Sequence, residues 1–341
     1  MTQEPVLVVD RLTTQMMFGR VLCKIVEDIS FKLYPGKTLA LVGESGCGKT
    51  ITALSIMRII PTPPALPSQG QIFFKGKDLL KLSESEMRKI RGARIAMIFQ
   101  DPISALNPVF TVGNQLIEVA ELHLKIYGDE AIERAVKILD EVGIIAPREC
   151  LSAYPHQLSG GMKQRVMIAM ALMCEPDILI ADEPTTALDV TIQAQILALI
   201  KELQTRMNMA VLLITHDMDV VGEVADEVIV MYASQVMERG SSKQVFTTMS
   251  HPYTLGLFQS RPTLNTPRGK LKAIPGTVPH PTNYPEGCRF HPRCPFMMPK
   301  CKHGNVPDFE IHHEKSHKSK CWLYDESEES RLKLLQRNRN D

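Results

Sequence analysis

One segment of the sequence places glycines, a lysine and a threonine at a spacing that can hold phosphate. Residues 43–50 read Gly-Glu-Ser-Gly-Cys-Gly-Lys-Thr and fit the pattern G-x4-G-K-[ST]. They follow a short apolar run at residues 37–42 and precede an apolar segment at residues 50–60, which is the strand–loop–helix context that this pattern requires. Backbone N–H groups of such a loop surround an anion at the start of a helix. Lys49 would reach the β and γ phosphates of a nucleotide, and the Thr50 hydroxyl would ligate Mg²⁺.

Two adjacent carboxylates follow another apolar run. Residues 178–181 are Ile-Leu-Ile-Ala, and Asp182 and Glu183 come directly after them. In open α/β sheets, ligands bind at the C-terminal ends of the strands. Asp182 would help to hold Mg²⁺, and Glu183 would orient and deprotonate the water that attacks the γ phosphate. The pattern is weak on its own, because strands often end in acidic turn residues, and the phosphate loop strengthens it.

These residues need a scaffold, and the apolar pattern predicts one. Near-continuous apolar runs indicate buried parallel strands at residues 37–42, 95–99, 177–181 and 209–215. Two further strands are expected at residues 25–33 and 70–74. Apolar stripes predict amphipathic helices at residues 129–143 and 191–207. Alternating strands and helices favour a mainly parallel sheet that is covered on both faces.

Composition excludes several classes of protein. The chain has 341 residues, 44% of them apolar and 23% charged, which is typical of a globular protein of about two domains. The longest apolar run, residues 166–174, is far shorter than the roughly 18 residues that cross a bilayer. The start of the chain lacks the basic and apolar regions of a secretion signal. A net charge of +1 gives no electrostatic footprint for nucleic acid or anionic membrane.

Four of the eight cysteines are close together in the sequence. Cys288, Cys294, Cys301 and Cys321 lie in a proline-rich, loop-rich region that begins near residue 250. Their spacing is not the C-x2-C pairing of common zinc modules. Four thiolates suit tetrahedral Zn²⁺ or a [4Fe–4S] cluster. The spacing alone leaves zinc, a cluster and the absence of a metal open.

A third motif indicates the family. Residues 158–165 read Leu-Ser-Gly-Gly-Met-Lys-Gln-Arg, with Ser159 at the position of a helix N-cap and Gly160 and Gly161 allowing close backbone approach. With the two motifs above, this segment resembles the signature of ATP-binding cassette (ABC) ATPases. The resemblance implies an α/β fold of the P-loop NTPase class, with a RecA-like parallel-sheet core, an antiparallel β subdomain and a helical subdomain at about residues 105–175. It also implies a dimer in which two cassettes enclose two ATP molecules head to tail.

The resemblance assigns roles to further residues. Gln100 resembles the glutamine that senses Mg²⁺ and water, His216 the histidine that contacts the γ phosphate, and Asp189 a residue of the loop that communicates across the dimer. Phe18 stands where the family places an aromatic ring under the adenine. The catalytic set implied is Glu183, His216 and Gln100, and the Mg²⁺ ligands implied are Thr50, Gln100 and Asp182. The residues expected to bind ATP are Phe18, Gly43, Glu44, Ser45, Gly46, Cys47, Gly48, Lys49, Thr50, Gln100, Ser159, Gly160, Gly161, Asp182 and Asp189.

Four other segments resemble the peptide-import branch of this family. They are residues 101–108, 154–158, 251–254 and 274–279, and the chain is most similar to dipeptide and oligopeptide importer ATPases with a cysteine-bearing tail. This implies an ATP-binding domain at residues 1–250, a C-terminal extension with a four-cysteine metal site at 251–325, and a polar tail at 326–341. For that site the resemblance favours a [4Fe–4S] cluster over Zn²⁺.

The resemblance implies an ATPase subunit that drives the uptake of di- and oligopeptides. Its partners would be two integral membrane permease subunits, a sister ABC ATPase or a second copy of the chain, and indirectly an extracytoplasmic peptide-binding protein. The expected location is peripheral, on the cytoplasmic face of the inner membrane. Nickel or another small solute stays open as the cargo. The neutral charge argues against a soluble ABC ATPase that acts on nucleic acid or ribosomes. The intact set of Lys49, Asp182, Glu183 and His216 argues against a metal-binding redox regulator in which ATP is secondary.

Overall fold

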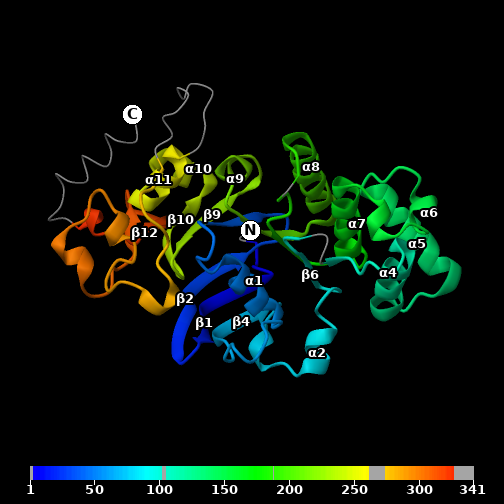
Figure 1. Cartoon of the computed structure of the whole chain (residues 1–341), viewed down its shortest axis with the longest axis horizontal. Helices are drawn as coiled ribbons and strands as arrows, with labels where there is room; N and C mark the ends of the chain where they lie inside the picture. The colour runs from blue at the N-terminus through cyan, green and yellow to red at the C-terminus, as the bar shows by residue number, and fades with distance from the viewer. Residues whose placement is uncertain (1–2, 102–104, 187, 261–272, 326–341) are drawn as a thin grey trace. The chain divides into compact units, whose positions relative to one another are not determined.

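The structure is a computed structural model, and it describes residues 3–101, 105–186, 188–260 and 273–325 (Figure 1). The chain divides into two compact units. The first unit consists of Met1–Val8, Lys32–Thr38 and Ile72–Ile214, and the second of Val9–Phe31, Leu39–Gln71 and Thr215–Asp341. The predicted polar tail at residues 326–341 lies outside the described residues.

Three parallel strands form the sheet of the first unit. They are β6 (Ile95–Ile98), β7 (Ile178–Asp182) and β8 (Ala210–Thr215), with β7 in the middle. Ile178 is in register with Ile95 on one side and with Ala210 on the other. Every residue of the three strands is buried, as expected where a parallel sheet is covered on both faces. The parallel strands predicted from the apolar runs at 95–99, 177–181 and 209–215 are confirmed.

Helices α4, α5, α6 and α7 of the first unit contact one another and form one group (Figure 1). Their bounds are Val112–Val119, Gly128–Glu141, Pro147–Cys150 and Gly160–Leu172. The long helix α8 (Val190–Met207) begins after β7, and α5 and α8 are the two predicted amphipathic helices. The unit also contains β5 (Lys77–Asp78), η1 (Leu79–Lys81), α2 (Glu84–Arg88), η2 (Ala120–Leu124) and η3 (Pro155–Gln157).

The sheet of the second unit has the strand order β11-β12-β10-β9-β3. Strands β3 (Thr38–Val42) and β9 (Glu227–Tyr232) are parallel, and β10 (Gln235–Ser241), β12 (Glu314–Ser319) and β11 (Phe309–Ile311) add antiparallel pairs. The loop-rich prediction for the region after residue 250 is therefore wrong in part, because it contributes two strands to this sheet. Strand β12 (Glu-Lys-Ser-His-Lys-Ser) contains no apolar residue, so the alternation of apolar and polar residues that indicates a strand is missing there.

The remaining elements of the second unit surround this sheet. Strands β1 (Leu7–Phe18) and β2 (Val21–Leu33) neighbour each other in a second sheet, to which β4 (Gln69–Phe74) also belongs. The helices are α1 (Lys49–Met57), α9 (Met218–Val224), α10 (Ser242–Thr248) and α11 (Pro252–Gln259). Four 3-10 turns complete the unit: η4 (Pro281–Asn283), η5 (His291–Arg293), η6 (Pro299–Lys302) and η7 (Trp322–Tyr324).

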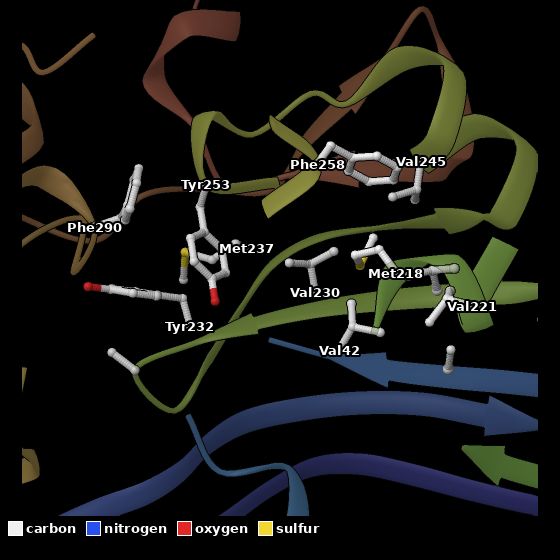
Figure 2. Packing of buried hydrophobic residues seen from close by; sticks show 13 residues of the cluster. Val42, Met218, Val221, Val230, Tyr232, Met237, Val245, Tyr253, Phe258 and Phe290 are labelled. Carbon is white, nitrogen blue, oxygen red and sulfur yellow. The ribbon is translucent and has the colours of Figure 1, made fainter. Parts of the chain in front are cut away.

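An aromatic cluster joins the sheet of the second unit to the C-terminal region (Figure 2). Tyr232 at the end of β9, Tyr253 of α11 and Phe290 are fully buried. The Tyr232 and Tyr253 ring centroids are 4.7 Å apart, and Phe290 lies 5.3 Å from each of them. Such aromatic pairs add about 0.5–1.5 kcal/mol beyond the burial of their surface. Residues far apart in the sequence thus share one core. No helix among the described residues is long and apolar enough to cross a bilayer.

Candidate functional site

The phosphate loop of the second unit wraps tightly between β3 and α1. Gly43 has φ +150° and Gly48 has φ +107°, conformations that L side chains rarely adopt. A Cβ atom at Gly43 would overlap the carbonyl oxygen of Met231, and one at Gly48 would overlap that of Ile25. The backbone of the loop can therefore pass this close to β9 and β2 only because both residues are glycine.

Lys49 lies within this loop and is 5% exposed. Its Nζ donates hydrogen bonds to the carbonyl oxygens of Gly43 at 2.7 Å and Glu44 at 3.1 Å, and lies 3.8 Å from Cys47 Sγ. Burial raises the pKa of the Cys47 thiol, although the Lys49 charge opposes this. Cys47 is thus a neutral, packed thiol, and the ammonium group is held among the loop carbonyls at the start of α1.

Glu44 connects the phosphate loop to the C-terminal region. Its backbone N–H donates a 2.8 Å hydrogen bond to the Tyr253 hydroxyl oxygen. Its carboxylate accepts two hydrogen bonds from the Arg293 guanidinium, at 2.5 Å and 3.0 Å. Burial disfavours the Arg293 charge, but the hydrogen bonds to Glu44 and Tyr232 outweigh it and raise the Arg293 pKa. Arg293 therefore stays charged in this position.

The predicted adenine platform lies at the end of β1. Phe18 is 36% exposed, and its ring meets the ring of His280 edge to face with centroids 5.4 Å apart. His280 comes from the C-terminal region, and its Nδ1 lies 2.8 Å from the Thr282 hydroxyl. Phe18 is thus a surface aromatic ring, not a core residue.

In the first unit, three residues near the end of β7 form a hydrogen-bonded group. Gln100 Nε2 donates to Glu183 Oε2 at 2.9 Å, and the Thr186 hydroxyl donates to the same oxygen at 2.9 Å. Glu183 has φ +48°, an uncommon conformation for a residue with a Cβ. Its N–H donates to Ile214 O at 2.8 Å, which extends the pairing between β7 and β8. Strained residues that neighbours hold in place are typical of active sites.

Asp182 is the last residue of β7 and is 2% exposed. It is in register with Ile214 of β8. A carboxylate this deeply buried is costly unless a cation or hydrogen bonds compensate for it. Asp182 is the residue expected to help hold Mg²⁺, and it lies at the C-terminal end of a buried strand.

The signature motif begins helix α7. Ser159 is its N-cap, and the Ser159 hydroxyl accepts a hydrogen bond from Met162 N at 3.3 Å, as predicted. Gly160 and Ser159 are exposed, while a Cβ at Gly161 would lie 3.3 Å from an Ile192 methyl carbon. The buried Gln164 donates a 2.5 Å hydrogen bond to Pro184 O. This bond ties the signature helix to the segment that follows Glu183.

Two other residues with predicted roles lie at the boundaries of secondary-structure elements. Asp189 is the N-cap of α8, and its carboxylate accepts a 3.0 Å hydrogen bond from Ile192 N. His216 is exposed and follows β8 directly. The predicted ATP-site residues thus fall into two groups: Phe18, residues 43–50 and His216 in the second unit, and Gln100, residues 159–161, Asp182, Glu183 and Asp189 in the first.

The four clustered cysteines lie in the second unit. Three of them, Cys288, Cys301 and Cys321, share one apolar cluster, and Cys294 packs with Cys288 against the aromatic cluster. Cys301 and Cys321 are buried with Leu255, Met298 and Leu323, and Cys288 packs against this group. Burial, supplemented by the neighbouring thiols, raises the pKa to about 11 at Cys288 and to about 12 at Cys294. Among the described residues, however, no group of three or more His, Cys, Asp or Glu side chains is arranged to hold a metal ion. The structure therefore does not contain the formed metal site that the resemblance implies.

Sequence reasoning gave no role to Tyr253 or Arg293. Tyr253 belongs to the segment 251–254, which carried the resemblance to peptide importers, and this was the available signal. Arg293 stands one residue before Cys294, and nothing in its local pattern indicates a contact with the phosphate loop 249 residues away.

Comparison with known proteins identifies the family. The model of the ABC transporter family matches residues 26–186, and that of the oligopeptide/dipeptide transporter C-terminal region matches residues 237–301. The dipeptide transport ATP-binding protein DppD of Bacillus subtilis is 52% identical over 304 residues, which cover 89% of this chain and 90% of DppD. The oligopeptide transport ATP-binding protein AppD of the same organism is 49% identical, over 88% of this chain and 91% of AppD.

A solved structure supports the same conclusion. The ATP-binding cassette MJ0796, in a dimeric post-hydrolysis state bound to ADP and Pi, matches with a TM-score of 0.62 and 25% identity. The match covers 69% of this chain and 98% of that one. The fold is therefore an ABC ATPase cassette with a mixed sheet and helices, for which ATP and Mg²⁺ are expected. The chain belongs to the family of dipeptide and oligopeptide ABC transporter ATP-binding proteins, which couple ATP hydrolysis to transport.

Proposed function

We propose that this chain hydrolyses ATP at a head-to-tail dimer of cassettes and thereby drives the uptake of di- or oligopeptides. The observation that carries the proposal is the Glu183 carboxylate, which Gln100 and Thr186 hold at the end of a buried parallel strand. Family membership supplies the transport role, because the relatives in the comparison are named for dipeptide and oligopeptide transport.

Residues of the two units would have different roles in binding and hydrolysing ATP. Lys49 and the loop N–H groups of residues 43–50 would bind the β and γ phosphates, while Phe18 would stack on the adenine. Thr50, Asp182 and Gln100 would hold Mg²⁺, which neutralises charge on the phosphates. Glu183 would take a proton from the attacking water. His216 would contact the γ phosphate.

Residues 159–161 and Asp189 would act across the dimer. The N-terminus of α7 begins at Ser159, and backbone N–H groups at a helix start favour a bound phosphate. In this proposal the phosphate belongs to ATP held by the opposite subunit. ATP would then favour the closed dimer, and hydrolysis would return it to the open state.

Membership of this family implies membrane permease partners. We further propose two permease subunits, which would bind the helical region at about residues 105–155 near Gln100, and a sister ATPase or a second copy as the dimer partner. The chain would then lie on the cytoplasmic face of the inner membrane and receive peptide through an extracytoplasmic binding protein. The domain boundaries proposed at residues 250 and 325 separate the cassette from its extension and the extension from its polar tail.

For the extension we propose that Cys288, Cys294, Cys301 and Cys321 hold a [4Fe–4S] cluster, with Zn²⁺ as the alternative. The supporting observation is that backbone hydrogen bonds lower the thiol pKa and so favour the thiolate: those from Phe290 and His291 act on Cys288, that from Phe296 on Cys294 and that from Leu323 on Cys321. Such hydrogen bonds stabilise thiolates bound to metal. A bound cluster would cross-link the loops of the extension, and no chemistry on the peptide is involved.

Uptake measurements test the transport proposal. Cells that lack this chain should lose uptake of labelled dipeptide, and the wild-type gene should restore it while Glu183→Gln should not. Arg88→Gln, which removes an exposed ion pair with Glu84 on α2, outside the proposed permease-binding region, serves as the matched surface control. Labelled Ni²⁺ uptake in the same cells distinguishes the cargo. If neither solute depends on the chain, the transport proposal is wrong.

A further inference from the structure

Two segments of the C-terminal region meet at one residue of the phosphate loop. Tyr253 of α11 is 0% exposed and accepts the backbone N–H of Glu44. Arg293 of η5 binds the Glu44 carboxylate through both terminal nitrogens. The loop would therefore change its shape at Glu44 only if these buried contacts were broken.

Arg293 is fixed by its other contacts. Its side chain is 6% exposed. Its Nε donates to Pro275 O at 2.8 Å, and Nη2 lies 3.4 Å from Ile274 O and 3.3 Å from Gly276 O. These carbonyls belong to the segment 274–279, one of the four that resemble peptide importers. A guanidinium group with this many partners cannot follow a mobile loop, and it acts as a fixed anchor.

The charge of Glu44 gives this anchor a second role. A carboxylate in a loop that surrounds polyphosphate opposes binding, since like charges at short range repel. The paired guanidinium neutralises it. Without Arg293, the carboxylate would be unpaired beside the phosphates. The pair therefore affects both the shape of the loop and its charge.

We propose that Arg293 and Tyr253 are positioning residues for ATP: they hold and neutralise Glu44, and the C-terminal region thereby sets the affinity of the phosphate loop. This inference rests on the proposed function, because it assumes that the loop binds ATP. It gives the segments 251–254 and 274–279 a physical role in the nucleotide site. Neither residue touches the reacting atoms, so their effect should fall on ATP binding and leave the chemical step nearly unchanged.

The test compares five variants of the full chain for Mg-ATP affinity, turnover at saturating ATP and thermal stability. These are Arg293→Gln, Tyr253→Phe, Glu44→Gln, the double variant Glu44→Gln/Arg293→Gln, and the control Arg239→Gln. The control removes another arginine–carboxylate pair of the same unit, in which Arg239 Nη2 lies 2.8 Å from Asp308. Glu44 is partly exposed, so its variant should fold even if Arg293→Gln does not.

We expect Arg293→Gln to weaken ATP binding about tenfold, with turnover at saturation within about twofold of wild type. Tyr253→Phe should weaken binding by a smaller factor. The decisive result is rescue: the double variant should bind ATP more tightly than Arg293→Gln, because the unpaired carboxylate is gone. Arg239→Gln should bind like wild type.

Two results would overturn the inference. One is a double variant as weak as Arg293→Gln or weaker, which would show that packing and not charge governs the loop. The other is unchanged ATP affinity in Arg293→Gln. Failure of the proposed function gives a different result, because wild type itself would then bind no ATP and Lys49→Ala would change nothing.

Discussion

Gln100 Nε2 and Glu183 Oε2 are 2.9 Å apart, and this hydrogen bond joins the residues that follow two neighbouring parallel strands, β6 and β7. The Thr186 hydroxyl donates a hydrogen bond to the same oxygen, also at 2.9 Å. Two donors on one carboxylate oxygen fix the plane of the carboxyl group. The arrangement would orient Glu183 in its proposed role as the general base, through groups that need not react themselves.

Replacing the proposed base separates binding from chemistry. In Glu183→Gln the side chain keeps its shape, and its carbonyl oxygen can still accept from Gln100 and Thr186. We expect ATP hydrolysis to fall at least about 100-fold, with the affinity for Mg-ATP preserved. Phosphate release under single turnover and equilibrium nucleotide binding measure the two effects.

Removing the donors tests the orientation of Glu183, and Thr186→Val is the cleaner variant because Gln100 is also a proposed Mg²⁺ ligand. Gln100→Ala should lower turnover by about tenfold, and Thr186→Val should have a smaller effect, because each leaves the carboxylate intact. Hydrolysis in Glu183→Gln at the wild-type rate would show that another group is the base.

One glycine of the phosphate loop and one glycine outside it separate the cost of a steric overlap from the cost of backbone strain. Gly48 and Gly76 both have positive φ, +107° and +81°. A Cβ at Gly48 would overlap Ile25 O, whereas one at Gly76 would meet nothing within 4 Å. Gly76→Ala should therefore cost only the conformational strain, about 1 kcal/mol. Gly48→Ala should cost more than about 2 kcal/mol and abolish ATP binding. Equal losses of stability in denaturant titrations would mean that the predicted overlap is relieved elsewhere.

The sequence predicts those helices and strands whose apolar residues recur with a regular period, and those helix ends that carry a capping residue. The apolar runs of β6, β7 and β8 and the stripe of α5 are visible in sequence because burial on one face, or on both, imposes a period. Ser159 was predicted as an N-cap because serine before a helix satisfies a free N–H group. The fold class and the candidate ATP-site residues thus came from local signals and from the family resemblance that they support.

Long-range contacts carried no such signal. The pairing of β12 with β10, at Glu238 and Ser319, joins segments about 80 residues apart, and β12 is mostly polar. The contact of Arg293 with Glu44 depends on how the whole C-terminal region packs against the rest of the second unit. A single sequence shows which residues can form an ion pair, but not which of many charged partners they meet.

The cysteine proposal predicts the content of protein purified without oxygen. Burial raises the pKa of the Cys288, Cys294 and Cys321 thiols, which therefore stay protonated at neutral pH unless a metal displaces the protons. We expect a broad visible absorption band and roughly four irons per chain, both lost in Cys321→Ser. Cys174→Ser is the matched control, because Cys174 lies outside the cluster in the sequence and its pKa is also raised, to about 11. One zinc per chain and no iron would select the alternative. Protein that contains neither zinc nor iron would contradict the proposal.

Stability should depend on pH through a histidine of the C-terminal region. His251 is 1% exposed, and its Nδ1 accepts a 3.0 Å hydrogen bond from Tyr253 N as the N-cap of α11. Burial lowers the pKa of His251 to about 4, although the Glu238 charge opposes this. In the unfolded chain the pKa is near 6.5, so below that pH the unfolded state binds a proton that the folded state does not. Folding stability should therefore fall as the pH drops from about 6.5 to about 4, by up to about 3 kcal/mol.

The variant His251→Asn isolates this effect. Asparagine is also a good N-cap and can accept the Tyr253 N–H, but it does not titrate. Trp322, the only tryptophan of the chain, lies in the same unit and reports its unfolding by fluorescence. Denaturant midpoints of wild type should fall between pH 6.5 and 4, and those of His251→Asn should fall less. Parallel curves for the two proteins would assign the loss of stability to other groups.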